Sequence, residues 1–108
     1  MFTYNKDCQA VACEPGVSRK VLSYSDELMM CEILFETGAK GYVHSHPHLQ
    51  ITYIAKGKFE FTIGEEKKVV SQGDSVYMPS GAIHEVHCLE EGILVDVFNP
   101  KRDEFIKA

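Results

Sequence analysis

The amino-acid sequence predicts an all-β barrel or sandwich of roughly eight strands. From about residue 20 onward, short strand-like segments alternate with turn signals, and no stretch keeps the 3.6-residue apolar period of a helix. The turn signals are clusters of glycine with polar residues or proline, at residues 37–41, 56–58, 64–66, 72–74, 79–81 and 90–92. The segments between them, about 5 to 7 residues each, have typical strand lengths.

Two segments show the alternation of a half-buried strand. In residues 58–63, Phe59, Phe61 and Ile63 share one face of an extended chain, and the intervening polar residues share the other. In residues 31–35 the odd positions are again apolar, but Leu34 lies among the even ones. This second strand is therefore expected to be covered on both faces, as in a closed or sandwiched sheet.

The two ends of the chain depart from the strand pattern. Residues 1–19, which contain Glu14-Pro15-Gly16, are interpreted as an N-terminal arm, and residues 101–108 as a short helical turn after Pro100. No linker, repeat or low-complexity tract separates the rest. A chain of 108 residues with 44% hydrophobic and 25% charged residues predicts one globular domain, residues 1–108.

Composition also limits the binding partners and the cellular location that we expect. The net charge of −5 and the scattered lysines leave no basic face for nucleic acid. No apolar run approaches the ~20 residues that span a bilayer, and the N-terminus lacks a signal-peptide core, so we expect no membrane association and a cytoplasmic protein. The cysteines are interpreted as free thiols that are buried or half-buried, with a zinc site built on them as the lesser alternative: Cys8, Cys13, Cys31 and Cys88.

A histidine-rich segment carries the clearest chemical signal. His44 and His46 point to the same face of an extended chain and can bind one metal ion, with Gln50 nearby in sequence. His84 would complete the site if the barrel brings its strand opposite. The alternative is a merely solvated polar strand, about as common for an isolated H-x-H pair. His48 is expected either at the pocket rim or next to the metal ligands, or else at the surface, and His87 outside the pocket.

The spacing of these residues resembles the cupin superfamily. Its two motifs run G-x5-H-x-H-x3-E-x6-G and G-x5-P-x-G-x2-H-x3-N. The chain has, at that spacing, Gly38, His44, His46, Gln50 and Gly57 in residues 38–57, then Gly73, Pro79, Gly81, His84 and Cys88 in residues 73–88. Eight of these ten residues match in type, the exceptions being Gln50 for Glu and Cys88 for Asn.

The resemblance implies a single cupin domain, a double-stranded β-helix or jelly-roll barrel, with metal ligands at His44, His46, Gln50 and His84. The metal would be one divalent transition ion, Zn, Ni, Mn, Fe or Co, because imidazole and amide ligands accept several. A neutral amide at Gln50 leaves the 2+ charge uncompensated, which strengthens the Lewis acid and favours an anionic substrate. The alternative is that Gln50 only forms hydrogen bonds and water completes the site.

Near the C-terminus, Asp96 lies in the middle of the apolar segment 93–98, where a carboxylate needs a partner or a wet pocket. Phe98 shares its strand face and Arg102 follows shortly after. If that face lines the barrel interior, an acid, an aromatic wall and a cation converge near the metal. The alternative is that Asp96 caps a backbone group and Arg102 is solvated.

Residues 14–20, 44–50 and 96–102 together resemble the KdgF-type cupins of pectin and alginate breakdown. That family converts 4,5-unsaturated monouronates to the linear ketonised sugar acid, which implies a small anionic sugar-acid substrate and makes Asp96, Phe98 and Arg102 catalytic or substrate-contacting residues. Other cupins are iron dioxygenases, sugar isomerases or stand-alone binding proteins, so these remain alternatives. Small cupins are commonly dimers, and we expect a homodimer.

Overall fold

The computed structural model describes residues 1–106, which form an antiparallel eight-stranded sheet with two 3-10 turns. The strands, in chain order, are β1 (Val11–Ala12), β2 (Val17–Tyr24), β3 (Met29–Phe35), β4 (Lys40–His44), β5 (Leu49–Ile63), β6 (Glu66–Ser71), β7 (Ser75–Met78) and β8 (His84–Asn99). The turns are η1 (Asn5–Asp7) and η2 (Asp103–Phe105), and no helix within residues 1–106 is long and apolar enough to cross a membrane. The predicted all-β class is confirmed.

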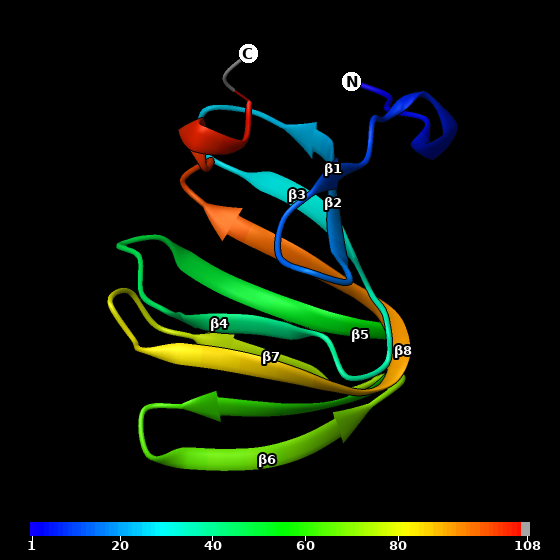
Figure 1. Ribbon diagram of the computed structural model, residues 1–108. Coiled ribbons are helices and arrows are strands. Elements are labelled where there is room, and N and C mark those ends of the chain that lie inside the picture. The colour runs from blue at the N-terminus through cyan, green and yellow to red at the C-terminus, as the bar shows by residue number, and fades with distance from the viewer. Residues whose placement is uncertain (107–108) are drawn as a thin grey trace.

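Two long strands, β5 and β8, run through both layers of the fold. The first half of β5 pairs with the second half of β8, and β3 and β7 flank this pair. The second half of β5 pairs with the first half of β8, and there β6 and β4 are the outer strands. Figure 1 shows β8 curving from one layer to the other at one edge of the molecule. The curved pair joins the layers into the expected jelly-roll barrel.

The predicted turns at residues 56–58 and 90–92 are instead bends inside these long strands. Gly57 and Gly92 cross so closely that a Cβ on Gly92 would lie 2.0 Å from the carbonyl oxygen of Lys56. Gly57 also has a φ of +90°, a conformation that L side chains rarely adopt. Because both positions are glycine, the two backbones can cross closely at the bend. Neither strand reverses direction there.

The same bend changes which residues of β5 face inward. Gln50, Thr52 and Ile54 are buried before it, whereas Phe59 and Phe61 are buried after it. The pairing with β8 shifts register between Ile54 and Phe59. One extra residue on one strand exchanges the two faces of a sheet. The even-numbered ligand candidates and the odd-numbered aromatic residues therefore point into the same barrel.

Apolar side chains fill the barrel interior from the bend toward the site. Phe59 is fully buried and packs edge-on against Phe35, with ring centroids 5.3 Å apart. On β3 the odd positions from Met29 to Phe35 are all buried, as expected, and Leu34 is half-buried. Two of the free cysteines are buried core residues as expected, Cys31 and Cys88, and Cys8 is half-buried, whereas Cys13 is exposed and contradicts the expectation. Because Met29 and Cys31 pair with Phe98 and Asp96, the apolar core extends from the bend to the edge of the site at the other end of the barrel.

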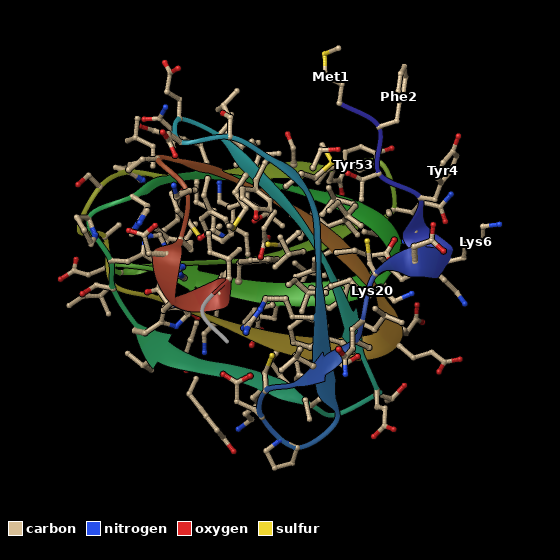
Figure 2. The ribbon with its side chains drawn as sticks, turned by 90° about the horizontal axis from the view of Figure 1, so that it is seen from above. Met1, Phe2, Tyr4, Lys6, Lys20 and Tyr53 are labelled. Carbon is tan, nitrogen blue, oxygen red and sulfur yellow. The ribbon has the colours of Figure 1, made fainter. Side chains whose placement is uncertain are left out.

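At the N-terminus, the predicted arm 1–19 is shorter than expected. Gly16, with a φ of +78°, turns the chain so that β2 already begins at Val17 and pairs with β3. Figure 2 shows Met1 and Phe2 pointing away from the strands. At the other end, the short helical turn predicted for residues 101–108 corresponds to η2, and its last two residues lie outside the described part of the chain.

Candidate metal centre and active-site cavity

Three histidines from the two motifs meet at the open end of the barrel. His44 ends β4 and His84 begins β8, and the two residues oppose each other in register. His46 follows in the next loop, which is tied to the second motif because Gly81 N–H donates to His46 O at 2.8 Å. The candidate ligand atoms of the three imidazoles all lie within 4.8 Å of one another. This triad could hold a metal ion.

Each of these imidazoles is oriented by a backbone carbonyl. The Nδ1 atoms lie 2.6 Å from Tyr42 O for His44, 3.1 Å from His48 O for His46 and 3.0 Å from Ala82 O for His84. A carbonyl oxygen only accepts, so each Nδ1 carries the proton. The Nε2 lone pair is then free on every ring. Such a second partner is the usual way in which proteins orient metal-ligating histidines.

The contact between His46 and Gln50 fits a cation. Nε2 of His46 lies 2.9 Å from Oε1 of Gln50, and both atoms are acceptors when Nδ1 holds the ring proton. A proton or a metal ion between them would relieve the repulsion. Burial lowers the pKa of His46, which disfavours the extra proton. With the amide oriented as it is here, both lone pairs suit a shared metal ion.

The surroundings differ between His84, His48 and His87. Burial lowers the pKa of His84 to about 4, so this ring is neutral at pH 7. His48 is half-buried, and its Nε2 donates to Lys101 O at 3.2 Å. Its backbone carbonyl also accepts the hydrogen bond from His46 Nδ1, so His48 helps to orient a ring of the triad. His87 lies outside the lining of the cavity, as the sequence predicts.

Asp96 lies in the middle of β8 with only 9% of its surface exposed. Its Oδ1 accepts a hydrogen bond of 2.6 Å from the hydroxyl of Thr52, the residue that opposes it on β5. Burial raises the pKa of Asp96 to about 6, and the hydrogen bond from Thr52 lowers it. The carboxyl group can therefore both accept and release a proton near neutral pH.

Phe98 and Arg102 form the wall next to Asp96. The Phe98 ring is buried, and its centroid lies 5.8 Å from that of His46. The guanidinium carbon of Arg102 lies 5.0 Å from the Phe98 centroid and 4.4 Å from that of Phe105. Its Nε is buried without a hydrogen-bond acceptor within residues 1–106, although Glu104 Oε1 lies 3.4 Å away.

The predicted site residues, with the exception of His46, line one cavity of about 410 Å³. Its lining includes His44, Gln50, His84, Asp96, Phe98 and Arg102. A larger open hollow of about 710 Å³ beneath residues 12–18 contains none of the histidines. The structure thus brings the predicted site residues together, while their chemical roles stay predictions.

Sequence reasoning missed three residues of this site. Arg19 and Phe105 also line the cavity, and their side chains stack with the guanidinium carbon 3.8 Å from the ring centroid. Thr52 links Gln50 to Asp96, and its even position on β5 was the available signal. Cys88, which stands at a motif position, is buried and contacts Glu90 O, away from the cavity lining. The metal-ligand cluster found within residues 1–106 contains no cysteine.

The sequence pattern of the cupin domain matches residues 31–98. The chain belongs to the cupin family. It is 43% identical over 93 residues to the pectin degradation protein KdgF of Dickeya dadantii (strain 3937), covering 84% of each chain. The resemblance to the KdgF-type cupins is thereby confirmed.

Two solved cupin structures have nearly the same fold. KdgF from Halomonas sp. superposes with a TM-score of 0.93 at 33% identity, covering 98% of both chains. An RmlC-like cupin from Shewanella frigidimarina NCIMB 400 also gives a TM-score of 0.93, at 35% identity, covering 97% of this chain and 95% of that one. These values extend the cupin assignment to nearly the whole chain.

Proposed function

We propose that the protein is a metal-dependent enzyme of pectin or alginate breakdown that converts 4,5-unsaturated monouronates to the linear ketonised form. The observation that carries this proposal is the shared cavity, which a buried carboxyl group and an arginine line together with two histidines of the triad. The identity of 43% to a pectin degradation protein supports the same substrate class. The conversion is an isomerisation, so it requires no oxidant or second substrate.

The metal would be held by His44, His46, Gln50 and His84. Three oriented imidazoles and one amide oxygen suit several divalent ions, including Zn, Ni, Mn, Fe and Co. When bound, the ion supplies a Lewis acid that polarises a sugar oxygen. Because all four ligands are neutral, the site would keep its positive charge and attract a uronate.

Asp96, Phe98 and Arg102 would handle the organic part of the substrate. Ring opening breaks the C1–O5 bond, removes a proton from the anomeric hydroxyl and finally adds one at C4. The carboxyl group of Asp96, with its pKa raised to about 6 by burial, is suited to such a transfer.

Arg102 and Phe98 would position the substrate for this transfer. The Nε–H of Arg102 is buried and has no acceptor in good geometry within residues 1–106, so it is available to the substrate carboxylate. Phe98 offers a flat apolar wall beside His46. The substrate carboxylate would have to displace Glu104, whose ion pair with Arg102 spans 3.4 Å.

The decisive experiment follows the ultraviolet absorbance of the conjugated C4–C5 double bond, which disappears when C4 is protonated. Metal-loaded protein should accelerate the decay of galacturonate- or mannuronate-derived substrate above the spontaneous rate, and chelator-treated protein should not. Readdition of metal should restore the rate. If the loaded protein gives no excess with either substrate, the isomerase assignment fails, and a dioxygenase or a binding role takes its place.

The expected homodimer and cytoplasmic location stay predictions of the proposal. Supporting the dimer, a row of apolar residues that are neighbours in register crosses the outer sheet face: the exposed Met30, Ile51 and Tyr77 and the half-buried Val97. Sedimentation at increasing protein concentration tests this association. A sedimentation coefficient that stays at the monomer value would exclude it.

A further inference from the structure

A buried row of polar side chains connects the candidate metal centre to Asp96. Gln50 and Thr52 project inward from β5, and Thr52 is completely buried opposite Asp96 on β8. Gln50 Nε2 donates to Thr52 Oγ1 at 3.0 Å, and Thr52 Oγ1 donates to Asp96 Oδ1 at 2.6 Å. The amide oxygen of Gln50 then faces Nε2 of His46 at 2.9 Å.

The direction of these hydrogen bonds follows from the number of protons. An ionised carboxyl group only accepts, and a threonine hydroxyl has one proton to donate. Once Thr52 gives that proton to Asp96, its oxygen can only accept from Gln50. Gln50 must therefore turn its NH₂ group toward Thr52 and its oxygen toward the histidines. A rotation of the amide by 180° would place two oxygens without a proton against each other.

We infer that Thr52 is a positioning residue, whose hydroxyl holds the amide oxygen of Gln50 toward the metal. This inference rests on the metal centre of the proposed function. Without the hydroxyl, both amide orientations become accessible, and the one that presents NH₂ has no lone pair for an ion. Thr52 thus lets a neutral amide serve where the cupin motif has a carboxylate.

A carboxylate at position 50 would not need this orientation, because it presents an oxygen on both sides. The hydroxyl of Thr52 would even oppose a carboxylate there, since its single proton is already donated to Asp96. The benefit of the hydroxyl should therefore depend on whether residue 50 is Gln or Glu. A purely structural role of Thr52 would not produce that dependence.

The test compares Thr52→Val and Thr52→Ser in the natural chain and in Gln50→Glu. Valine keeps the shape of threonine without the hydroxyl, and serine restores the hydroxyl. Binding of Co²⁺ and Zn²⁺ is measured by competition with a chromophoric chelator, and the visible spectrum of the Co²⁺ protein reports its ligand set. Thr62→Val is the matched control on β5, because no side-chain hydrogen bond of Thr62 is found within residues 1–106.

We expect Thr52→Val to weaken metal binding by about 10-fold in the Gln50 protein, the usual lower range for loss of a group that orients a ligand. The Co²⁺ spectrum should change with it, and Thr52→Ser should restore both. In the Gln50→Glu background, Thr52→Val should leave affinity unchanged or raise it. Thr62→Val should have no effect in either background.

Equal losses of affinity in both backgrounds would overturn the inference, and so would failure of Thr52→Ser to restore binding. A wild-type protein that binds neither ion would overturn it together with the metal centre. These measurements need no substrate. Loss of the proposed reaction alone, with the affinity pattern intact, would therefore disprove the uronate assignment and leave the role of Thr52 standing.

Discussion

The two walls of the cavity are built in different ways. The histidine wall, consisting of His44, His46 and His84, is oriented by backbone carbonyls within two residues of each ring. In the acid wall, consisting of Asp96, Phe98 and Arg102, the carboxyl group is bonded to Thr52 from a distant part of the chain, whereas Arg102 stacks on the nearby Phe105. Local sequence therefore orients the rings of the first wall, whereas the carboxyl group of the second depends on a tertiary contact.

Burial acts on both walls, with opposite effects on their pKa values. It lowers the pKa of His84 to about 4, and it raises that of Asp96 to about 6. In each case the neutral form is favoured, because a charge is poorly solvated in the cavity. A metal ion would bind to the neutral imidazoles. Proton transfer would depend on the carboxyl group of Asp96, because its pKa is raised. The following experiments separate the two walls.

The largest effect is expected for the double variant His44→Ala, His46→Ala. It removes two of the three clustered imidazoles, and bound metal should fall from about one equivalent to near zero. Elemental analysis of protein purified without chelator measures this. His87→Ala, outside the cavity lining, is the control and should keep its metal. Full metal content in the double variant would show that the histidine wall is not the metal site.

Asp96→Asn should separate proton transfer from metal binding. The amide keeps the shape of the side chain but cannot accept a proton, so kcat on the unsaturated uronate should fall by ~10²-fold or more. Metal content should stay within about twofold, because Asp96 is not part of the histidine cluster and an amide oxygen at position 96 can still accept the hydrogen bond from Thr52. A variant with wild-type kcat would remove Asp96 from the mechanism.

A smaller effect is expected for Arg102→Ala. Loss of a charge-assisted hydrogen bond to the substrate carboxylate should raise KM about 10-fold, with a lesser loss in kcat. Lys101→Ala is the matched control, because the Lys101 ammonium forms an ion pair with Asp26. Steady-state kinetics with saturating metal measure both variants. If the two variants raise KM equally, the effect is general electrostatics and not recognition by Arg102.

The contrast between the walls also explains what could be predicted from the sequence. Motif spacing and strand alternation were sufficient for the fold and for the histidine cluster, because His46 follows two residues after His44 at the end of β4 and His84 lies at the register position opposite His44. Asp96 was noticeable as a charge in an apolar strand. These signals are local in the chain.

Contacts distant in sequence could not be predicted in the same way. The stacking of Arg19 on Phe105 joins residues from opposite ends of the chain. The bends at Gly57 and Gly92 resemble turns in sequence, and only their mutual crossing shows that both strands continue. Thr52 looks like an ordinary strand residue until Asp96 is placed opposite it.

The smallest expected effect concerns the stability of metal-free protein, where the two walls should respond oppositely to acid. The pKa of Asp96 is raised from 3.8 to about 6 in the folded state. Its contribution to the free energy of unfolding is therefore fully present below pH ~4 and is lost as pH rises through about 6. The pKa of His84 is lowered from 6.5 to about 4, so its contribution is present above pH 6.5 and is lost as pH falls toward 4. Between pH 6 and 4 the two contributions oppose each other.

Asp96→Asn removes one side of this balance, since the amide does not titrate. On acidification from pH 6 to 4, the variant should therefore lose more free energy of unfolding than the wild type, by about 1 to 3 kcal/mol on the scale of 1.36 kcal/mol per unit of pKa. Urea unfolding of chelator-treated protein at half-unit steps of pH measures the difference. His84→Gln should change the slope in the opposite direction. Parallel curves for wild type and Asp96→Asn would mean that Asp96 stays ionised throughout this range. Its hydrogen-bond partners would then stabilise the carboxylate more strongly than burial destabilises it.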